Sequence, residues 1–227
     1  MTQGRGRHPA RIRMKKPDQA LLDRYMLVWS TRELHFHTGN FPPVTSQSIF
    51  GTNALLILDI GSATGELSHA LAADHPDFNI LGIEISTKPI WRSLVNAHRK
   101  NLHNVKYLKT DFRLLYPLMQ PDSVQAAYLH FPVPVLTGAD EKHAIFSERF
   151  LDALHIGLVD QGVIGFTSDN EHYFSDVAQR ASQRNDFRLL TDKKECEAAV
   201  PLHKSYYHDV WERQGRLTQR FVLLNRK

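Results

Sequence analysis

The chain has 227 residues, of which 42% are hydrophobic and one is cysteine, and its formal net charge is +4. This length and apolar content suffice for one large core, while the single Cys196 excludes an internal disulfide framework and a cysteine-rich zinc site. No apolar run approaches the roughly 20 residues of a membrane-spanning helix, and no apolar segment follows the basic start as in a signal peptide. We therefore expect a cytoplasmic protein without membrane contact or a bound metal.

The basic residues are concentrated at the start of the chain. Residues 1–16 hold six arginines and lysines and no acid, which leaves 22 basic and 24 acidic residues in the remainder. We predict that 1–16 is a flexible tail. Such a tail can neutralise phosphates of a nucleic acid, although a basic arm that only improves solubility has the same composition.

The next segment, 17–51, is predicted to hold one helix and a linker. Five apolar residues between Pro17 and Trp29 recur at helical spacing, with Pro17 acceptable in the first turn. Thr38 to Gly51 contains two prolines and two glycines, which is typical of a loop. We expect the main domain to occupy 52–227, with an insertion at 192–218 that lies on the substrate side.

That domain begins with the sequence LLILDIGSATGE, residues 55–66. Its apolar run predicts a strand buried on both faces, as in the middle of a parallel sheet. Gly61 and Gly65 allow a sharp turn, and helical spacing resumes at Glu66. A strand, a glycine turn and a helix form the ligand site of many open α/β sheets, although a plain tight turn has the same residues.

Strand and helix patterns alternate through the rest of the chain. Helices are predicted after Ser86 or Thr87, over Ser147–Ile156, and from Ser168 or Asp169 to about Gln183. The other predicted strands, of which the last two form an antiparallel pair, are Asn79–Ile85, Val105–Leu108, Val124–His130, Gly162–Thr167, Phe187–Leu190 and Arg220–Leu224. The fold class is therefore α/β, a doubly wound, mostly parallel seven-stranded Rossmann-like sheet with helices on both faces.

Glu84 points to the kind of ligand. It ends the second predicted strand 23 residues after Gly61, close to the spacing at which an acid reaches a ribose. The turn lacks the glycines of a dinucleotide fingerprint and the Lys-Ser/Thr pair of a phosphate loop. A nucleoside without phosphate fits better, and S-adenosylmethionine is the common one. Asp111, after the third strand, either accepts from the amine of a base or caps the next turn.

Five ordered motifs carry a family resemblance: LDIGSATGE, GIEIS, NVKYLKTD, the FPxP loop and SDNEHY. Together they resemble the bacterial tRNA (guanine-N7)-methyltransferase family, a class I methyltransferase fold that uses S-adenosylmethionine and releases S-adenosylhomocysteine. The resemblance implies that Glu66 lies on the methionine side, Glu84 at the ribose, and Thr110 with Asp111 near the adenine. The expected cofactor-binding residues are Asp59, Gly61, Ser62, Gly65, Glu66, Glu84, Ile85, Thr110, Asp111 and His130.

The departures from the family pattern fall on the substrate side. Val133 stands where the family has Asp, residues 135–137 differ, the following basic run is missing, and His208 replaces a late acid. A carboxylate can accept from guanine N1–H and its amine together, so these changes weaken the prediction of guanine binding. The expected substrate-binding residues are Phe131, Val133, Ser168, Asp169, Tyr173, Tyr206, Tyr207, His208 and Trp211.

Methyl transfer to an aromatic ring nitrogen does not require a general base. A nitrogen such as guanine N7 has a free lone pair and no proton, so alignment with the methyl carbon matters most. We expect Asp169 to orient the substrate, and His130 or His208 to act as a base if the target nitrogen carries a proton. The predicted catalytic residues are Asp169 and His130.

Three functions remain open, and we prefer the first. It is an N-methyltransferase that has diverged from its family to a small aromatic N-heterocycle, a metabolite or natural product, because phosphate contacts are scarce outside the tail. The second is a methyltransferase that acts on guanine in tRNA. The third is a non-catalytic protein of this fold that binds RNA or a protein partner. The sequence predicts no oligomeric state.

Overall fold

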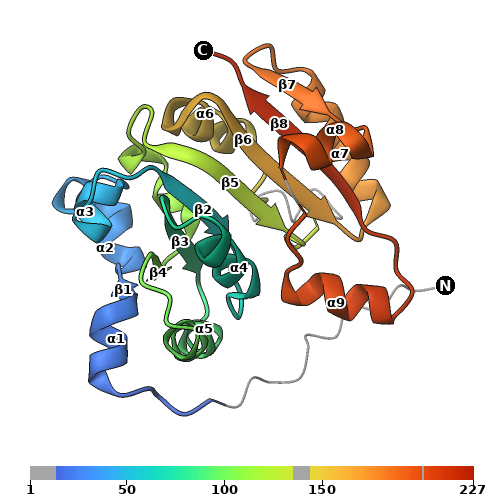
Figure 1. Cartoon of the computed structure of the whole chain (residues 1–227). Helices are drawn as coiled ribbons and strands as arrows, with labels where there is room; N and C mark the ends of the chain where they lie inside the picture. The colour runs from blue at the N-terminus through green and yellow to red at the C-terminus, as the bar shows by residue number, and fades with distance from the viewer. Residues whose placement is uncertain (1–13, 135–143, 201) are drawn as a thin grey trace.

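The computed structural model describes residues 14–134, 144–200 and 202–227, which form a sheet covered by helices on both faces (Figure 1). The sheet has eight strands in the order β1-β4-β3-β2-β5-β6-β8-β7. All neighbours from β1 to β6 are parallel, and β8 is antiparallel to both β6 and β7. The strands are β1 (Met26–Val28), β2 (Leu56–Ile60), β3 (Asn79–Glu84), β4 (Val105–Lys109), β5 (Val124–His130), β6 (Leu158–Ser168), β7 (Phe187–Leu190) and β8 (Gln219–Asn225).

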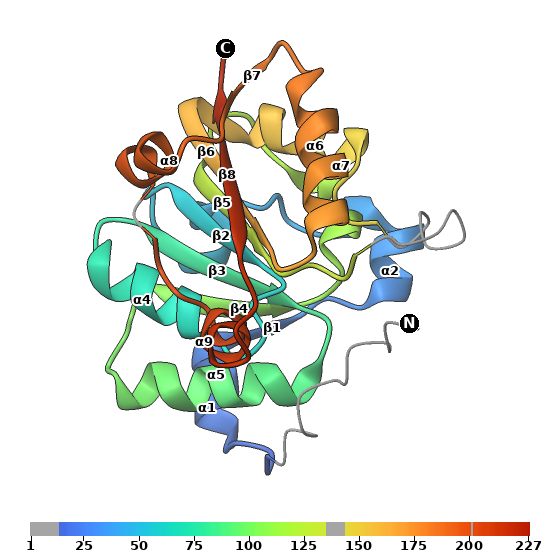
Figure 2. The ribbon, with the colours of Figure 1, turned by 90° about the vertical axis from the view of Figure 1, so that its right-hand side faces the viewer.

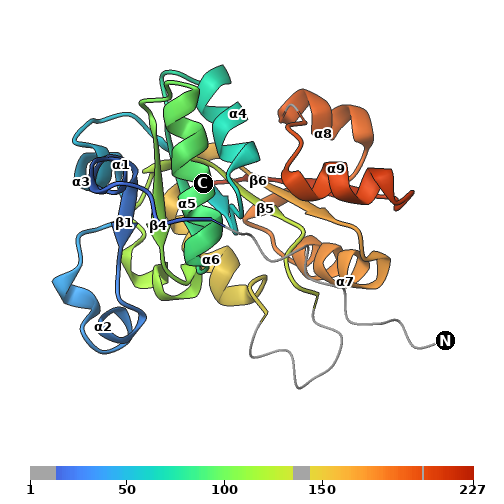
Figure 3. The same cartoon turned by 90° about the horizontal axis from the view of Figure 1, so that it is seen from below.

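The helices divide between the two faces of the sheet (Figure 3). One apolar cluster joins the sheet to α2, α3, α6 and α7, and a second joins it to α1, α4, α5 and α8. This arrangement confirms the predicted fold class. The helices are α1 (Gln19–Tyr25), α2 (Thr31–Phe36), α3 (Ser46–Phe50), α4 (Glu66–Asp74), α5 (Thr87–Arg99), α6 (Glu148–Gly157), α7 (Glu171–Ser182), α8 (Lys193–Ala199) and α9 (Tyr206–Arg213), with 3-10 turns η1 (Thr38–Asn40), η2 (Phe112–Leu114) and η3 (Tyr116–Leu118).

The number of strands corrects the prediction, because the described residues form eight instead of seven. The predicted helix Pro17–Trp29 ends at Tyr25, and Met26–Val28 then pairs in parallel with Tyr107–Lys109 at the edge of the sheet. Apolar spacing does not distinguish the last turn of a helix from a three-residue strand, and here pairing with β4 decides.

The predicted linker also contains regular structure. Thr38–Asn40 forms η1, and Ser46–Phe50 forms α3 after a capping box between Thr45 and Ser48. Gly51 ends α3 at φ 74°, a left-handed conformation that favours glycine. Short side-chain caps therefore build a helix in a segment whose prolines and glycines suggested a loop.

Two helix starts were predicted with alternatives that the structure resolves. Asn170, instead of Ser168 or Asp169, caps α7, because its side-chain oxygen accepts from the Tyr173 backbone N–H at 2.9 Å. Ser86 is the N-cap residue of α5, although its side chain makes no capping hydrogen bond. In both cases the turn places a strand end next to a helix start.

The segment predicted as an insertion, 192–218, contains α8 and α9. Figure 1 shows α9 at the lower right, on the side to which the arrowheads of the central strands point, and Figure 2, viewed from that side, shows α9 in front of the lower part of the sheet. Ring contacts from His208 to His130 and Phe131 fix this position at the end of β5. Within the described ranges, no helix is long and apolar enough to cross a membrane.

Candidate active site

The turn after β2 is held against the end of β3. Gly61 and Gly65 have φ angles of 78° and 81°, which glycine adopts without the steric cost that other residues meet. The backbone N–H groups of Gly61 and Ser62 both donate to the Ile83 carbonyl, at 2.8 and 3.1 Å. The turn therefore lies next to the end of β3, as its predicted role in ligand binding requires.

Gly65 is also enclosed by side chains. A Cβ at this position would lie 2.7 Å from the Tyr107 hydroxyl and 2.8 Å from Ser93 Cβ, whereas one at Gly61 would meet nothing within 4 Å. Both glycines are required by backbone conformation, but only Gly65 is also required by packing. The first turn of α4 can approach α5 and β4 this closely because residue 65 has no side chain.

Glu84 closes the same turn from the other side. Its carboxylate accepts from the Ala63 N–H at 3.2 Å and from the Ser86 N–H at 2.8 Å. The side chain thus connects the glycine turn to the start of α5. A carboxylate has about four acceptor positions, so two remain for hydroxyl groups of a ligand.

Groups beside Glu84 suit a nucleoside. The side chain of Ile85 is 67% exposed, an unusual environment for a large apolar residue at a strand end. The hydroxyls of Ser62 and Thr110 are buried and make no hydrogen bond within the described part of the chain. An apolar surface for a base, with a carboxylate for a ribose, matches the chemistry of an adenosyl group.

Asp111 is engaged by its own neighbour. Its carboxylate accepts from the Arg113 backbone N–H at 3.0 Å and pairs with the Arg113 guanidinium at 2.5 Å. Burial raises the pKa of Asp111, but the hydrogen bonds from Arg113 outweigh it and hold the pKa below its ordinary 3.8. The alternative in which Asp111 caps the next turn is confirmed, since it is the N-cap of η2. Its contact with adenine remains a prediction.

Asp59 lies beneath the glycine turn, 2% exposed. The Ser68 hydroxyl donates to its carboxylate at 2.5 Å, which joins the end of β2 to the first turn of α4. Burial raises the pKa of Asp59 from 3.8 to about 7, even though the Ser68 hydrogen bonds lower it. The side chain supports the turn from inside, and a direct contact with the cofactor remains a prediction.

The raised pKa of Asp59 predicts a pH-dependent stability difference. Folding favours the protonated carboxyl, so its contribution to the unfolding free energy is present below pH 4 and is lost as the pH rises through 7. Asp59→Asn should change little at pH 3.5 and stabilise the protein at pH 8 by at most about 4 kcal/mol. Urea denaturation of both proteins at several pH values measures this, and a difference that is constant with pH would contradict it.

A second group of residues gathers at the ends of β5 and β6. The Phe131 ring lies 4.7 Å from the ring of His208 and 6.2 Å from that of Tyr207, both on α9. Tyr207 in turn stacks on Trp211 at 6.1 Å. Four of the predicted substrate-binding residues therefore share one aromatic cluster, although they are up to 80 positions apart.

His130 lies at the base of this cluster. Its ring is 5.3 Å from that of His208, and its Nδ1 is buried with no hydrogen-bond partner in the described ranges. Burial lowers the pKa of His130 well below 6.5, and burial also lowers the pKa of His208. Both imidazoles are therefore neutral at pH 7, and neither places a positive charge at this edge.

Asp169 faces α9 from the end of β6. Its carboxylate accepts from the Arg216 guanidinium at 2.7 Å, and the same guanidinium lies 4.2 Å from the centre of the Trp211 ring. The Asp169 side chain is 18% exposed. Arg216 thereby connects the predicted orienting carboxylate to the aromatic cluster.

The other predicted substrate residues lie elsewhere. Val133 is 83% exposed, Tyr173 is 3% exposed against Phe166 in the core, and Ser168 accepts from the Asn170 N–H. Tyr206 belongs to α9, but its side chain is outside the described set, as are residues 135–137. The main role of Tyr173 is packing, because its buried ring on α7 contacts Phe166 in the core.

Arg220 was predicted only as part of a strand. It pairs with Thr167 across β8 and β6, donates to the Val200 carbonyl at 2.8 Å, and has a buried Nε without a partner among the residues described. Burial lowers its pKa, and its charge helps to lower that of His130. The sequence signal that could have identified Arg220 is its place at the start of an apolar strand. Because β8 runs antiparallel to β6, the start of β8 lies at the carboxyl end of β6, where the site is.

Comparisons with known proteins identify the family. A family model described as "Putative methyltransferase" matches residues 53–220. A relative from Chloroherpeton thalassium, named tRNA (guanine-N(7)-)-methyltransferase, is 42% identical over 226 residues and covers 100% of both chains. A relative of the same name from Rubrobacter xylanophilus is 32% identical over 214 residues, 94% of this chain and 96% of its own.

Solved structures support the fold alone. An rRNA methylase from Streptococcus thermophilus superposes with a TM-score of 0.54 at 10% identity, over 77% of this chain and 89% of its own. The antibiotic-resistance methyltransferase Kmr gives 0.53 at 13% identity, over 80% and 92%. Both are methyltransferases by name, and at these identities they establish the Rossmann-like architecture.

The preferred functional prediction, divergence to a small aromatic heterocycle, is wrong. Relatives that match essentially the whole chain at 42% and 32% identity carry the tRNA methyltransferase name. The departure at Val133 was given too much weight, because an 83% exposed side chain encloses no small ring. With the family model and full-length relatives in agreement, the chain belongs to the tRNA (guanine-N7)-methyltransferase family and is an S-adenosylmethionine-dependent methyltransferase.

Proposed function

We propose that this enzyme transfers the methyl group of S-adenosylmethionine to N7 of a guanine in tRNA. The observation that carries the proposal is the meeting of two groups at one edge of the sheet. Glu84 and the glycine turn lie at the ends of β2 and β3, and the aromatic cluster with Asp169 lies at the ends of β5 and β6. The names of the full-length relatives support the same acceptor.

On the cofactor side, the proposed contacts follow the chain. Glu84 accepts from the ribose hydroxyls, and the exposed Ile85 packs on the adenine. Backbone groups between Gly61 and Gly65 face the methionine end, because glycine φ angles let the main chain approach a ligand closely. Thr110 contributes a hydroxyl that has no other partner in the described ranges.

The chemistry requires positioning more than proton transfer. The cofactor supplies an electrophilic methyl group on a positively charged sulfur. Guanine N7 carries a lone pair and no proton, so His130 and His208 need not act as bases. Their lowered pKa values keep both rings neutral, which avoids repulsion with the cofactor sulfur and with the positive charge that forms on the methylated base.

On the substrate side, Asp169 orients the guanine. Its carboxylate accepts from N1–H and the exocyclic amine, while Phe131 and Tyr207 offer ring faces to the base. Arg216 shares the carboxylate in the structure, so guanine either displaces this guanidinium or binds at the remaining lone pairs. Asp169 thereby supplies a carboxylate on the substrate side although Val133 and His208 replace acids of the family pattern.

The variant Asp169→Asn tests this role. Charge-assisted hydrogen bonds contribute about 1.5–3 kcal/mol each, so kcat/KM for tRNA should fall by about 100-fold. The Kd for S-adenosylmethionine should not change, because Asp169 lies at the end of β6 and the glycine turn follows β2. Asp209→Asn, an exposed change on α9, is the matched control and should leave both constants unchanged.

Transfer of radiolabel from the cofactor to an unmodified tRNA transcript tests the function itself. Incorporation by the parent enzyme and its loss in Asp169→Asn are expected. An enzyme that binds S-adenosylmethionine by calorimetry but labels no tRNA would overturn the proposal.

A further inference from the structure

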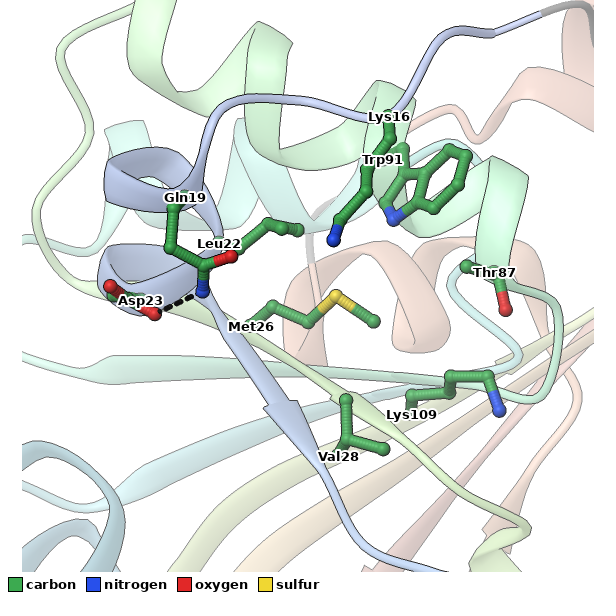
Figure 4. A pocket seen from close by; sticks show the side chains of 9 residues that line it. All are labelled: Lys16, Gln19, Leu22, Asp23, Met26, Val28, Thr87, Trp91 and Lys109. Carbon is green, nitrogen blue, oxygen red and sulfur yellow. Dashed lines mark hydrogen bonds between the residues drawn. The ribbon is translucent and has the colours of Figure 1, made fainter.

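A pocket of about 410 Å³ lies between α1, β1 and α5, outside the site described above. Figure 4 shows the side chains of Lys16, Trp91 and Met26 around one hollow, with Thr87 and Lys109 at one side. The remaining lining residues are Gln19, Leu22, Asp23 and Val28. Its volume is within the range of small-ligand sites, and its wall combines an indole, apolar side chains and two cations.

Within the described part of the chain, the indole and the two ammonium groups that could bind a ligand here have no ring or acid partner of their own. Among the described residues, Trp91 stacks on no other aromatic ring, and neither Lys16 nor Lys109 forms an ion pair with an acid. The one acid in the lining, Asp23, accepts from the Gln19 side-chain amide at 2.7 Å. The pocket is therefore lined, within the described ranges, by an indole that stacks on no other ring and by two ammonium groups, which together complement an anion attached to an aromatic base.

The pocket lies at the same edge of the sheet as the candidate active site. Val28 and Lys109 end β1 and β4, and Thr87 opens α5 directly after the turn that follows β3. From β4 to β5 there are three strand spacings, or about 14 Å. None of the groups proposed to bind the cofactor or the guanine lines the pocket. A single extended ligand can therefore reach both places.

We propose that this pocket binds an unpaired nucleotide of the RNA substrate, with its base on Trp91 and its phosphate between Lys16 and Lys109. The inference rests on the proposed function, because it assigns a second contact to the same tRNA. Charge supports an RNA ligand: residues 1–16 carry six cations and no acid, and Lys16, which ends this run, lines the pocket.

A base that stacks on an indole makes a contact that does not depend on sequence. Stacking on an aromatic side chain needs an unpaired base, because bases in a duplex are already stacked. The pocket thus favours tRNA with an exposed loop or bulge near the target guanine over a continuous duplex. It contributes affinity and leaves the methyl-transfer step to the residues at β5 and β6.

The decisive experiment compares variants in tRNA binding and in turnover. Trp91→Ala should raise the Kd for fluorescein-labelled tRNA, and its KM, by about tenfold, with kcat at saturating tRNA within about twofold of the parent. Trp91→Phe should restore most of the affinity, because it keeps a ring. Lys16→Ala and Lys109→Ala should each weaken binding, and the variant that carries both changes should reduce the salt slope by about one, because the two lysines share one phosphate. Lys100→Ala, at the opposite end of α5, is the charge-matched control.

The possible outcomes distinguish failure of the pocket proposal from failure of the proposed function. If the parent methylates tRNA and these variants bind it as the parent does, the pocket proposal fails while the proposed function stands. If Trp91→Ala weakens S-adenosylmethionine binding instead, the pocket belongs to the cofactor site and the proposal also fails. A parent that binds tRNA without methylating guanine N7, with binding still lost in the variants, would overturn the function and keep the pocket. A parent that binds no tRNA would overturn both.

Discussion

Glu84→Ala is expected to weaken S-adenosylmethionine binding by at least about 100-fold. The substitution removes the carboxylate proposed to accept from two ribose hydroxyls, and each hydrogen bond to a charged group contributes about 1.5–3 kcal/mol. It also releases the backbone N–H groups of Ala63 and Ser86, which now donate to Glu84 at 3.2 and 2.8 Å. The glycine turn and the start of α5 would lose their shared partner.

Isothermal titration calorimetry with S-adenosylmethionine measures this effect. Glu197→Ala removes a carboxylate from the surface of α8 and should bind the cofactor as the parent does. Glu84→Gln separates the two roles, because an amide oxygen can still accept from a turn N–H but lacks the charge. An unchanged Kd in Glu84→Ala would show that the ribose binds elsewhere.

Gly65→Ala is expected to lower the unfolding free energy by about 2–5 kcal/mol. A φ of 81° costs an alanine about 1–2 kcal/mol, and a Cβ at 2.7–2.8 Å from Tyr107 and Ser93 adds about 1–3 kcal/mol of overpacking. Both neighbours belong to packed elements, so relief requires α4 to move away from α5. That movement would also distort the turn proposed to face the cofactor.

Gly51→Ala is the matched control for Gly65→Ala. Gly51 has nearly the same φ, 74°, but an added Cβ would meet nothing within 4 Å, so only the backbone strain of about 1–2 kcal/mol applies. Urea denaturation of both variants isolates the packing contribution. Equal losses in the two variants would contradict the close approach at Gly65.

The central strands and the glycine turn were predictable because their signals are local. Leu56–Ile60 is buried at every position, as its continuous apolar run requires, and Glu84 reaches the turn from the predicted distance along the chain. The edge strand β1 was not predictable, because three residues carry no period of their own. Its formation depends on pairing with β4.

The contacts of the site residues could not be predicted from the sequence, because they too depend on which elements lie side by side in the fold. Arg216 holds Asp169 from a position 47 residues away, and Arg220 approaches His130 only because β8 lies beside β6. The acceptor was mispredicted because a local change, Val133, outweighed the similarity of the whole chain. In the structure the Val133 side chain is exposed, and Asp169 remains as a carboxylate that Arg216 connects to the aromatic cluster.

The most direct test is to locate the methyl group on the product. An unmodified tRNA transcript is incubated with the enzyme and S-adenosylmethionine, and then treated with borohydride and aniline, which break RNA at N7-methylguanine. We expect cleavage at a guanine, dependent on the cofactor and absent for Glu84→Ala at low cofactor concentration. Methyl transfer to another atom of the tRNA, or none to tRNA by an enzyme that binds the cofactor, would contradict the assignment.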